Sequence, residues 1–224
     1  MKAMILAAGK GERMRPLTLR TPKPLLQAGG KALIDYHIEN LKAAGYTDLV
    51  INHAWLGAQL ESHLGDGHEY GVSITWSPEG EPLETAGGIR HALHRLTDRD
   101  DWFIVVNGDI WSDFAFDRLH PPAAGLALLV MTPNPPHNPT GDFHLDLDGT
   151  IRPDGSNPLT FTGISVLHRE LFSGIYGNDI KLGPILRRAA EAGQVRGITL
   201  GGNWFDIGTP ERLEQLDSWL SHQD

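Results

Sequence analysis

Short apolar segments alternate with amphipathic segments along the first half of this chain, and this alternation constrains the fold more than any other feature. The apolar runs are bounded by Gly, Pro or charged residues, which is typical of buried strands. The segments between them carry apolar residues at helical spacing. The expected strands are residues 2–9, 47–53, 72–78 and 101–110, and the expected helices are residues 33–45, 54–65 and 84–96. Strands that alternate with helices predict an α/β fold with a Rossmann-like, mostly parallel central sheet and flanking helices.

From about residue 123 the alternation loosens. Apolar runs at 125–133, 143–147, 159–167 and 195–200 predict strands of a smaller mixed or antiparallel part, with helices only near 179–192 and 210–220. No repeat, low-complexity stretch or linker separates the two parts. We therefore expect one domain over residues 1–224, with a first half to about residue 122 and a second half from about residue 123.

Charge is distributed unevenly along the 224 residues. Residues 1–31 hold seven Lys or Arg and one acid, a local charge of +6, whereas the rest of the chain carries −15 within a total of −9. A basic patch on an acidic protein predicts a bound anion and not a nucleic-acid surface. The chain has no cysteine, which excludes disulfides and thiolate metal sites. It shows no membrane span or signal peptide, so we expect a cytoplasmic protein without a membrane partner.

Two glycines, Gly9 and Gly11, follow the first expected strand, where backbone amides can approach a phosphate. A tight turn without a ligand would explain the pair equally well. A Walker A motif is absent, and a dinucleotide-binding fingerprint fails because Met14 occupies the place of its third glycine. That fingerprint also needs an acid at the end of the second strand, where Asn52 and His53 stand.

A longer pattern includes this loop: L-A-A-G-x-G-x-R-x-x-P-L-T-x-x-x-P-K-P-L, without a gap from Leu6 to Leu25. It resembles the signature of the nucleotidyltransferases that make nucleotide sugars from a nucleoside triphosphate and a sugar 1-phosphate. The resemblance implies the nucleotide-diphospho-sugar transferase fold, with Arg13 and Lys23 on the triphosphate and Lys23 facing the reacting phosphoryl group. The residues that it implies for nucleotide binding are Ala7, Ala8, Gly9, Gly11, Glu12, Arg13, Lys23, Glu79, Ala86 and Gly87. Those implied for catalysis are Arg13, Lys23 and Asp109.

Two aspartates complete the resemblance. Asp109 ends the most apolar strand in "VVNGDI", and Asp206 precedes the last expected helix in "NWFDIGTPERL". In the family this pair holds Mg²⁺, which takes few protein carboxylates and shares the rest of its octahedron with phosphates and water. We therefore expect Mg²⁺ as the cofactor, on Asp109 and Asp206. Asp206 could alternatively cap a turn.

The base and the sugar are assigned to the loops after later strands. Glu79 aligns where family members commonly carry Gln, and a carboxylate, which only accepts hydrogen bonds, suits the ring N–H of uracil, thymine or guanine. A solvated loop glutamate is the alternative. The family's Glu-Lys-Pro lysine is absent, and Arg152 is a candidate replacement. The sugar-binding candidates are Asn107, Gly108, Asp142, Thr162, Gly163 and Asn203.

The expected reaction is UTP plus a sugar 1-phosphate giving a UDP-sugar and pyrophosphate. In its short length and in the overall wording of its motifs, the chain resembles the uridylyltransferases of bacterial cell-wall (peptidoglycan) recycling. The sugar phosphate is already an anion, so no general base or covalent residue is required, which agrees with the absence of a Ser-His-Asp or Cys-His constellation. The alternatives are a guanylyl- or thymidylyltransferase acting on a hexose 1-phosphate, and a non-catalytic nucleotide-sugar sensor. The oligomeric state leaves no signal in the sequence.

Overall fold

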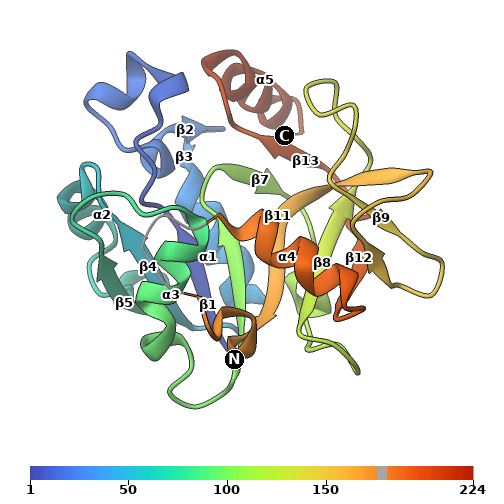
Figure 1. Cartoon of the computed structure of the whole chain (residues 1–224). Helices are drawn as coiled ribbons and strands as arrows, with labels where there is room; N and C mark the ends of the chain where they lie inside the picture. The colour runs from blue at the N-terminus through green and yellow to red at the C-terminus, as the bar shows by residue number, and fades with distance from the viewer. Residues whose placement is uncertain (176–180, 224) are drawn as a thin grey trace.

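The computed structural model describes residues 1–175 and 181–223. Its main sheet has nine strands, in the order β10-β9-β11-β6-β1-β4-β5, with β8 paired to β11 and β12 paired to β8 (Figure 1). The strands of this sheet are β1 (Lys2–Leu6), β4 (Asp48–His53), β5 (Ser73–Pro78), β6 (Trp102–Asn107), β8 (Ala127–Thr132), β9 (Phe143–Leu145), β10 (Ile151–Arg152), β11 (Pro158–His168) and β12 (Val195–Thr199). The α-helices are α1 (Leu33–Ala43), α2 (Gly57–Leu64), α3 (Thr85–Leu96), α4 (Leu182–Glu191) and α5 (Pro210–Ser221).

Four parallel strands, β5, β4, β1 and β6, form the first part of the sheet. Their register places Leu6 opposite both Asn52 and Asn107. The carboxyl ends of β4, β1 and β6 therefore meet in one row, and the loops that follow them share one edge of the sheet. Ligands of open parallel sheets bind at this edge.

The second part of the sheet is mixed. Strand β11 runs antiparallel to β6 and β8, and β12 runs parallel to β8. The register of β11 against β8 shifts between Phe161 and Ser165. This irregularity lies beside the site and bears on the sugar candidates below.

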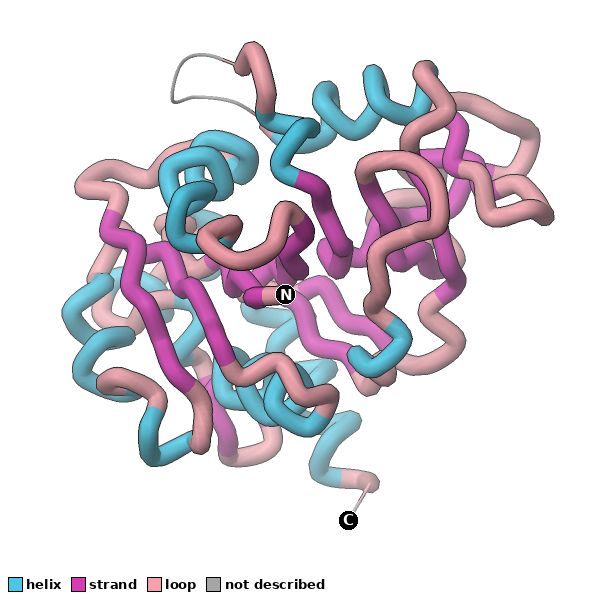
Figure 2. The backbone as a smooth tube through the Cα atoms, turned by 90° about the horizontal axis from the view of Figure 1, so that it is seen from below, coloured by secondary structure: helices cyan, strands magenta, loops and turns pink. Residues whose placement is uncertain are grey.

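Side chains that alternate along the strands bury two apolar clusters, one on each face of the sheet. Ile5 and Ile51 pack with Ile38 of α1 and Leu60 of α2. Their neighbours in β1 and β4 pack on the opposite face with α3 and α4, in a cluster that includes Met4, Val50, Ile89 and Ile185. Figure 2 shows the strands between these helical layers.

A third apolar cluster joins the two ends of the chain. It contains Met14 and Leu33 from the first part and Ile207 and Leu216 from the last. Four short strands and α5 surround it: β2 (Gln27–Ala28) pairs with β3 (Lys31–Ala32), and β7 (Ile110–Ser112) pairs with β13 (Trp204–Asp206). This packing fixes the segment that carries Asp206 against the segment that follows Asp109.

The predicted α/β fold is confirmed, with a mostly parallel sheet and a mixed second part. Strands β2, β3, β7, β10 and β13 were not expected as separate elements. Each has two or three residues, too short for a hydrophobic period to show. The helix expected near 179–192 begins at Leu182 in the described residues, and 179–180 lie outside them. Within the described residues, no helix combines the length and the apolar character that crossing a membrane requires.

Candidate active site

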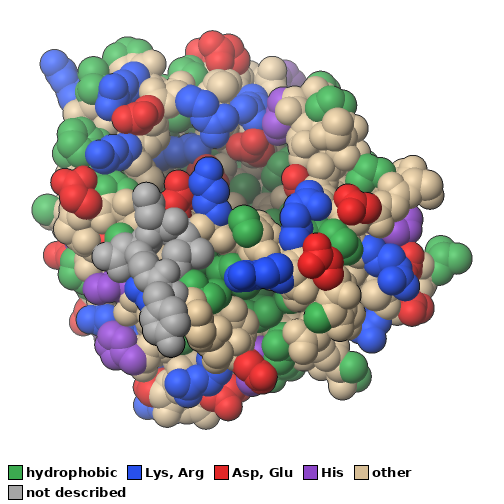
Figure 3. All heavy atoms as spheres, viewed as in Figure 1, with side chains coloured by type: hydrophobic (Ala, Val, Ile, Leu, Met, Phe, Trp, Pro, Cys, Tyr) green, Lys and Arg blue, Asp and Glu red, His purple; other side chains and the backbone are tan. Residues whose placement is uncertain are grey.

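A cavity of about 660 Å³ opens at the carboxyl ends of β1, β4 and β6. In the space-filling view the surface is hollowed in its upper half, with Lys and Arg side chains beside the hollow (Figure 3). The predicted residues that line the cavity are Ala7, Ala8, Gly9, Gly11, Glu12, Arg13, Lys23, Asn107, Gly108 and Asp109. The structure therefore brings together the loop after β1, the Lys23 segment and the end of β6.

The loop after β1 is anchored to both neighbouring strands. The Ala7 backbone N–H donates to Asn52 Oδ1 at 2.8 Å, and the Gly108 N–H donates to the Leu6 carbonyl at 2.9 Å. A Cβ on Gly108 would lie 2.5 Å from that Leu6 oxygen, so only glycine permits this approach. These contacts fix the position of the backbone at the start of the glycine loop.

Lys23 and Asp109 form an ion pair in the cavity, with Nζ 2.8 Å from Oδ2. Lys23 belongs to a short 3₁₀ turn, η3 (Lys23–Leu25), that Pro22 precedes, and only 8% of Lys23 is exposed. A nearly buried ammonium needs an anionic partner. In this structure the carboxylate of Asp109 provides it.

Arg13 lines the same cavity with an exposed side chain. Two other basic residues of the loop have acidic neighbours at the surface: Arg15 lies 3.5 Å from Glu12, and Lys10 lies 3.7 Å from Glu81. Exposed pairs at such distances contribute little to stability. Their side chains remain available to an anionic ligand.

Asp206 lies beside Asp109 through the β7–β13 ribbon. It pairs with Ile110 in register, and the next residue, Ile207, donates its N–H to the Asp109 carbonyl at 2.9 Å. Asp206 Oδ2 accepts from Arg212 Nη1 at 2.6 Å and lies 3.0 Å from His137 Nε2. Asp206 itself does not line the cavity, but Gly208 does.

Asp109 and Asp206 are too few to hold a metal ion by themselves, but they are enough for a Mg²⁺ ion that a bound phosphate also coordinates. Among residues 1–175 and 181–223, no group of three or more His, Asp or Glu side chains could hold a metal ion. Asp109 lines the phosphate-sized cavity, and Asp206 lies on the neighbouring strand without lining it. A site with so few protein carboxylates leaves most of an octahedron to phosphate oxygens and water, which is how Mg²⁺ is commonly bound.

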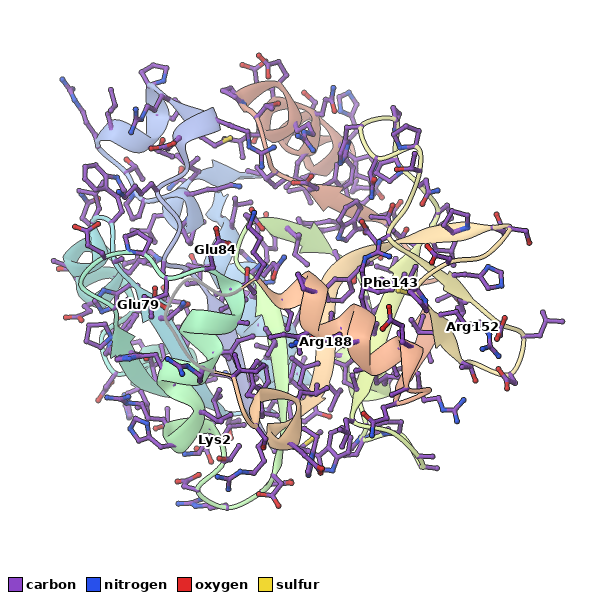
Figure 4. All side chains as sticks on the ribbon, viewed as in Figure 1. Lys2, Glu79, Glu84, Phe143, Arg152 and Arg188 are labelled. Carbon is purple, nitrogen blue, oxygen red and sulfur yellow. The ribbon has the colours of Figure 1, made fainter. Side chains whose placement is uncertain are left out.

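The side chain of Glu79, expected to read the base, is bound to other protein groups in this structure. Its Oε1 accepts from Asn52 Nδ2 at 2.6 Å and its Oε2 accepts from the Leu83 N–H at 2.8 Å. Glu79 does not line the cavity, whereas Asn52 and Glu84 do. Figure 4 shows Glu79 and Glu84 at separate places around α3. Glu79 thus holds Asn52, which in turn holds the Ala7 amide.

Ala86 and Gly87 are also outside the cavity lining, because both are buried in α3. Thr85, at the start of the helix, lines it instead. The small residues of "TAGG" let α3 pack closely on the sheet, and Ala86 belongs to the apolar cluster under that helix. The sequence located the loop and the helix, but not which of their residues line the cavity.

Thr162 and Gly163 form the irregular part of β11. Thr162 is 1% exposed, and its hydroxyl donates to the Val130 carbonyl at 2.8 Å. Gly163 adopts φ +84°, and a Cβ there would lie 2.6 Å from Asn107 Nδ2. Neither residue lines the cavity. Gly163 lies against the side chain of Asn107, which does line the cavity.

Asp142 and Asn203 also lie outside the cavity lining, and both are engaged elsewhere. Asp142 Oδ2 accepts from the Phe161 N–H at 2.8 Å and thereby ties the loop after β8 to β11. Asn203 donates from its N–H and its Nδ2 to the two oxygens of Asp113, each at 2.7 Å. Arg152, the candidate replacement for the missing lysine, is labelled in Figure 4. Its side chain pairs with Asp146 at 2.5 Å. It does not line the cavity either.

Asn52, the 81–85 loop and Gly208 also line the cavity, although the sequence analysis assigned none of them a binding role. The sequence indicates them only by position, since Asn52 is the penultimate residue of β4 and Gly208 follows β13.

Beneath the site, burial lowers the pKa of His37 in α1 to about 4, although the nearby Asp109 opposes the shift. His37 is therefore neutral at pH 7.

Comparisons with known proteins agree with this geometry. Residues 2–141 match the Nucleotidyl transferase family. The chain is 50% identical over 227 residues to N-acetylmuramate alpha-1-phosphate uridylyltransferase of Neisseria meningitidis serogroup B, with 97% of each chain covered. It is 34% identical to the protein of the same name from Caulobacter vibrioides, covering 93% of this chain and 92% of that one.

More distant similarities extend the comparison. A mannose-1-phosphate guanylyltransferase catalytic subunit beta from Danio rerio is 32% identical over 94% of this chain and 62% of its own length. A solved Bacillus anthracis protein, provisionally assigned as a glucose-1-phosphate thymidylyltransferase, superimposes with a TM-score of 0.84 at 22% identity, covering 98% of this chain and 95% of that one. At that identity the structural likeness concerns the fold alone. The chain belongs to the Nucleotidyl transferase family and is an enzyme of its sugar-phosphate nucleotidyltransferase kind.

Proposed function

We propose that this enzyme transfers a uridylyl group from UTP to N-acetylmuramate α-1-phosphate and releases pyrophosphate. The two relatives named for this activity support the choice of nucleotide and sugar, since their similarity spans more than nine-tenths of the chain. The product would be a UDP-sugar that returns to cell-wall synthesis. The reaction would take place in the cytoplasm.

The observation that carries the proposal is the ion pair between the nearly buried Lys23 and the partly exposed Asp109 inside the cavity, at 2.8 Å, beside the glycine loop. Lys23 is placed to exchange its carboxylate partner for phosphate oxygens when a triphosphate enters. Arg13 would form a fork across further phosphate oxygens, and the amides of residues 8–11 would receive the rest. Asn107 and Gly108 are the predicted sugar-binding residues that line the cavity.

In the reaction, an oxygen of the sugar phosphate attacks the α-phosphorus of UTP. A bond forms between that oxygen and Pα, and the bond from Pα to the bridging oxygen of the β-phosphate breaks, so pyrophosphate leaves with the electron pair. The attacking oxygen is already an anion, so no side chain has to remove a proton. The contribution of Lys23 and Arg13 is to bring two polyanions together and to offset the negative charge that gathers around Pα.

Mg²⁺ is part of the proposal, with Asp109 and Asp206 as its protein ligands. When bound, it would neutralise charge on the phosphate oxygens. Arg212, beside Asp206, would hold that carboxylate in one orientation, as residues around metal ligands commonly do. We further propose that residues 1–224 act as one domain, with nucleotide sites in the first half and sugar sites mainly in the second.

A substrate matrix tests the proposal directly. Pyrophosphate release is measured for UTP, GTP, dTTP, CTP and ATP against N-acetylmuramate α-1-phosphate, mannose 1-phosphate and glucose 1-phosphate, with and without EDTA. We expect the highest kcat/KM for UTP with N-acetylmuramate α-1-phosphate, and no release in EDTA. A higher kcat/KM for GTP with mannose 1-phosphate would replace this proposal with the guanylyltransferase alternative.

A further inference from the structure

One side chain from the β4–α2 connection and one from α2 hold the backbone of the loop that carries Arg13 and Lys23. Trp55 Nε1 donates to the Thr18 carbonyl at 2.9 Å, and Gln59 Nε2 donates to the Arg20 carbonyl at 2.9 Å. Both acceptors belong to, or directly follow, the short 3₁₀ turn η2 (Leu17–Leu19). In Figure 1 this blue segment lies at the same side of the molecule as α2. The middle of the loop is therefore fixed from outside the cavity.

The contact at Thr18 continues into the cavity. Thr18 is 1% exposed, and its Oγ1 donates to the Gly11 carbonyl at 2.7 Å. Gly11 lines the cavity, between the amides after β1 and Arg13. A chain of two hydrogen bonds thus links the Trp55 ring to the glycine loop.

A strained backbone residue directly follows Trp55. The next residue, Leu56, adopts φ +54° and ψ +28°, a left-handed conformation that is unfavourable for a side chain with a Cβ. Among the described non-glycine residues, Leu56 alone has a positive φ. Such strain persists only where surrounding contacts require it, and the contacts of the Trp55 ring with η2 are of that kind.

Trp55 also lines a smaller cavity that adjoins the main one. A second cavity of about 270 Å³ is lined by Trp55 and Leu56, and it shares Lys10, Glu12, Glu81 and Pro82 with the main cavity. The Trp55 side chain is 38% exposed, so its burial alone does not explain its placement. The ring borders the segment that must stay in place when a triphosphate enters.

We propose that Trp55 is a positioning residue for the triphosphate loop, defined here as residues 9–23. By holding Thr18, it presets the Gly11 carbonyl and, with it, the geometry of the amides, Arg13 and Lys23 before nucleotide binds. A loop that is ordered in advance loses less conformational freedom on binding, and a binding-competent state that is fully populated has the higher apparent affinity. The inference rests on the proposed nucleotide-binding function of this loop.

The chain offers a matched control in Trp76. Its Nε1 donates to the Gly65 carbonyl at 2.9 Å, also from a partly exposed ring to a backbone oxygen, but in β5 and away from the triphosphate loop. Trp55→Phe and Trp76→Phe therefore remove the same kind of hydrogen bond and keep an aromatic ring. A merely structural role would give the two variants the same effects.

The first measurement needs no ligand. Amide hydrogen exchange of the ligand-free protein is followed over residues 9–23 in the wild type and both variants. We expect faster exchange in this segment for Trp55→Phe and no change there for Trp76→Phe. Equal protection of residues 9–23 in all three proteins would overturn the proposal.

The second measurement is the dissociation constant of UTP with Mg²⁺ by calorimetry. Trp55→Phe is expected to weaken binding about threefold to tenfold, the equivalent of one net hydrogen bond, and Trp76→Phe to leave it unchanged. Thr18→Val should weaken binding similarly, and the double variant should fall short of the product of the two effects, because both act through one chain of contacts. Fully multiplicative effects would overturn the proposed relay.

The two measurements separate this inference from the proposed function. If the wild type fails to bind UTP, the proposed nucleotide is wrong, and hydrogen exchange alone decides the role of Trp55. If the wild type binds UTP and Trp55→Phe binds it equally well, the proposed function stands and the inference falls.

Discussion

At the scale of single residues, the site depends on which charges lie close together. The Lys23 ammonium is nearly buried and has the Asp109 carboxylate as its ion-pair partner at 2.8 Å. The Asp206 carboxylate has Arg212 and His137 beside it. Each predicted metal-binding acid is thus held by at least one basic side chain. Substitution of the acid or of its basic partner should therefore have a large effect on activity.

Lys23→Ala and Asp109→Ala should each lower kcat at least about a hundredfold, because each removes a preorganised charge that acts on the transferred phosphoryl group. The measurement is pyrophosphate release with saturating substrates, with circular dichroism to check folding. Lys31→Ala is the control, since Lys31 pairs with Glu39 at 2.6 Å on the surface and does not line the cavity. Turnover like that of the wild type in folded Lys23→Ala would contradict the assignment.

Glu79→Ala should reduce the free energy of unfolding by about 1–3 kcal/mol, because it leaves the Asn52 amide and the Leu83 N–H without their acceptor. Glu81→Ala is the matched control, since Glu81 is two residues away and its side chain is 88% exposed. Urea denaturation measures both variants. A change in preference from UTP to CTP in Glu79→Gln would instead support the base-reading role expected from the sequence.

At the scale of elements, the site is built where several elements end. Strands β1, β4 and β6 supply the row of Leu6, Asn52 and Asn107, and the β7–β13 ribbon brings Asp206 to Asp109. Helix α1 packs below the ribbon and contributes His37, whose Nε2 is buried without a hydrogen-bond partner among the described residues. An element in this position can make the stability of the whole site depend on pH.

His37 should make the protein less stable as pH falls below its unfolded pKa. Burial lowers the native pKa from 6.5 to about 4, so between these values the unfolded chain binds a proton that the native state does not. The contribution is absent above pH 7 and amounts to a loss of about 2 kcal/mol between pH 7 and pH 5. Urea denaturation of the wild type and His37→Gln at both pH values measures it. Equal pH dependence in the two proteins would show that folding does not lower the pKa of His37.

At the scale of the whole molecule, charge is arranged for an anionic ligand. Residues 1–31 carry +6 on a chain with a net charge of −9, and Arg13 and Lys23, which belong to that segment, line the cavity. The third apolar cluster joins this basic segment to α5, and the Gly29 N–H donates to Asp217 Oδ1 at 2.8 Å. The two ends of the chain therefore close the site together.

This arrangement predicts that salt weakens the encounter with nucleotide. The Debye length falls from about 10 Å at 0.1 M to about 3 Å at 1 M ionic strength, so attraction beyond direct contact is screened. We expect kcat/KM for UTP to fall several-fold between 0.05 and 0.5 M NaCl, as estimated from steering by a local patch. Stopped-flow or steady-state assays at both concentrations measure it. Insensitivity to salt would show that only contact interactions matter.

The sequence by itself determined the alternating elements, the glycine loop and the identities of the charged residues in and beside the cavity. The spacing of apolar residues and the uninterrupted Leu6–Leu25 pattern depend only on residues that are close in sequence. Each can therefore be recognised without knowledge of the tertiary contacts. Arg13, Lys23, Asp109 and the neighbouring glycines, which the sequence singled out, all line the cavity.

Only the tertiary structure decided which candidates face inward. Glu79 turned out to hold Asn52, Thr162 to hold Val130, and Asn203 to hold Asp113. These partners lie 27 to 90 residues away along the chain. A polar side chain bonds to whichever group packing brings nearest, and that neighbour is set by sheet register and strand order. No local pattern in the sequence contains it.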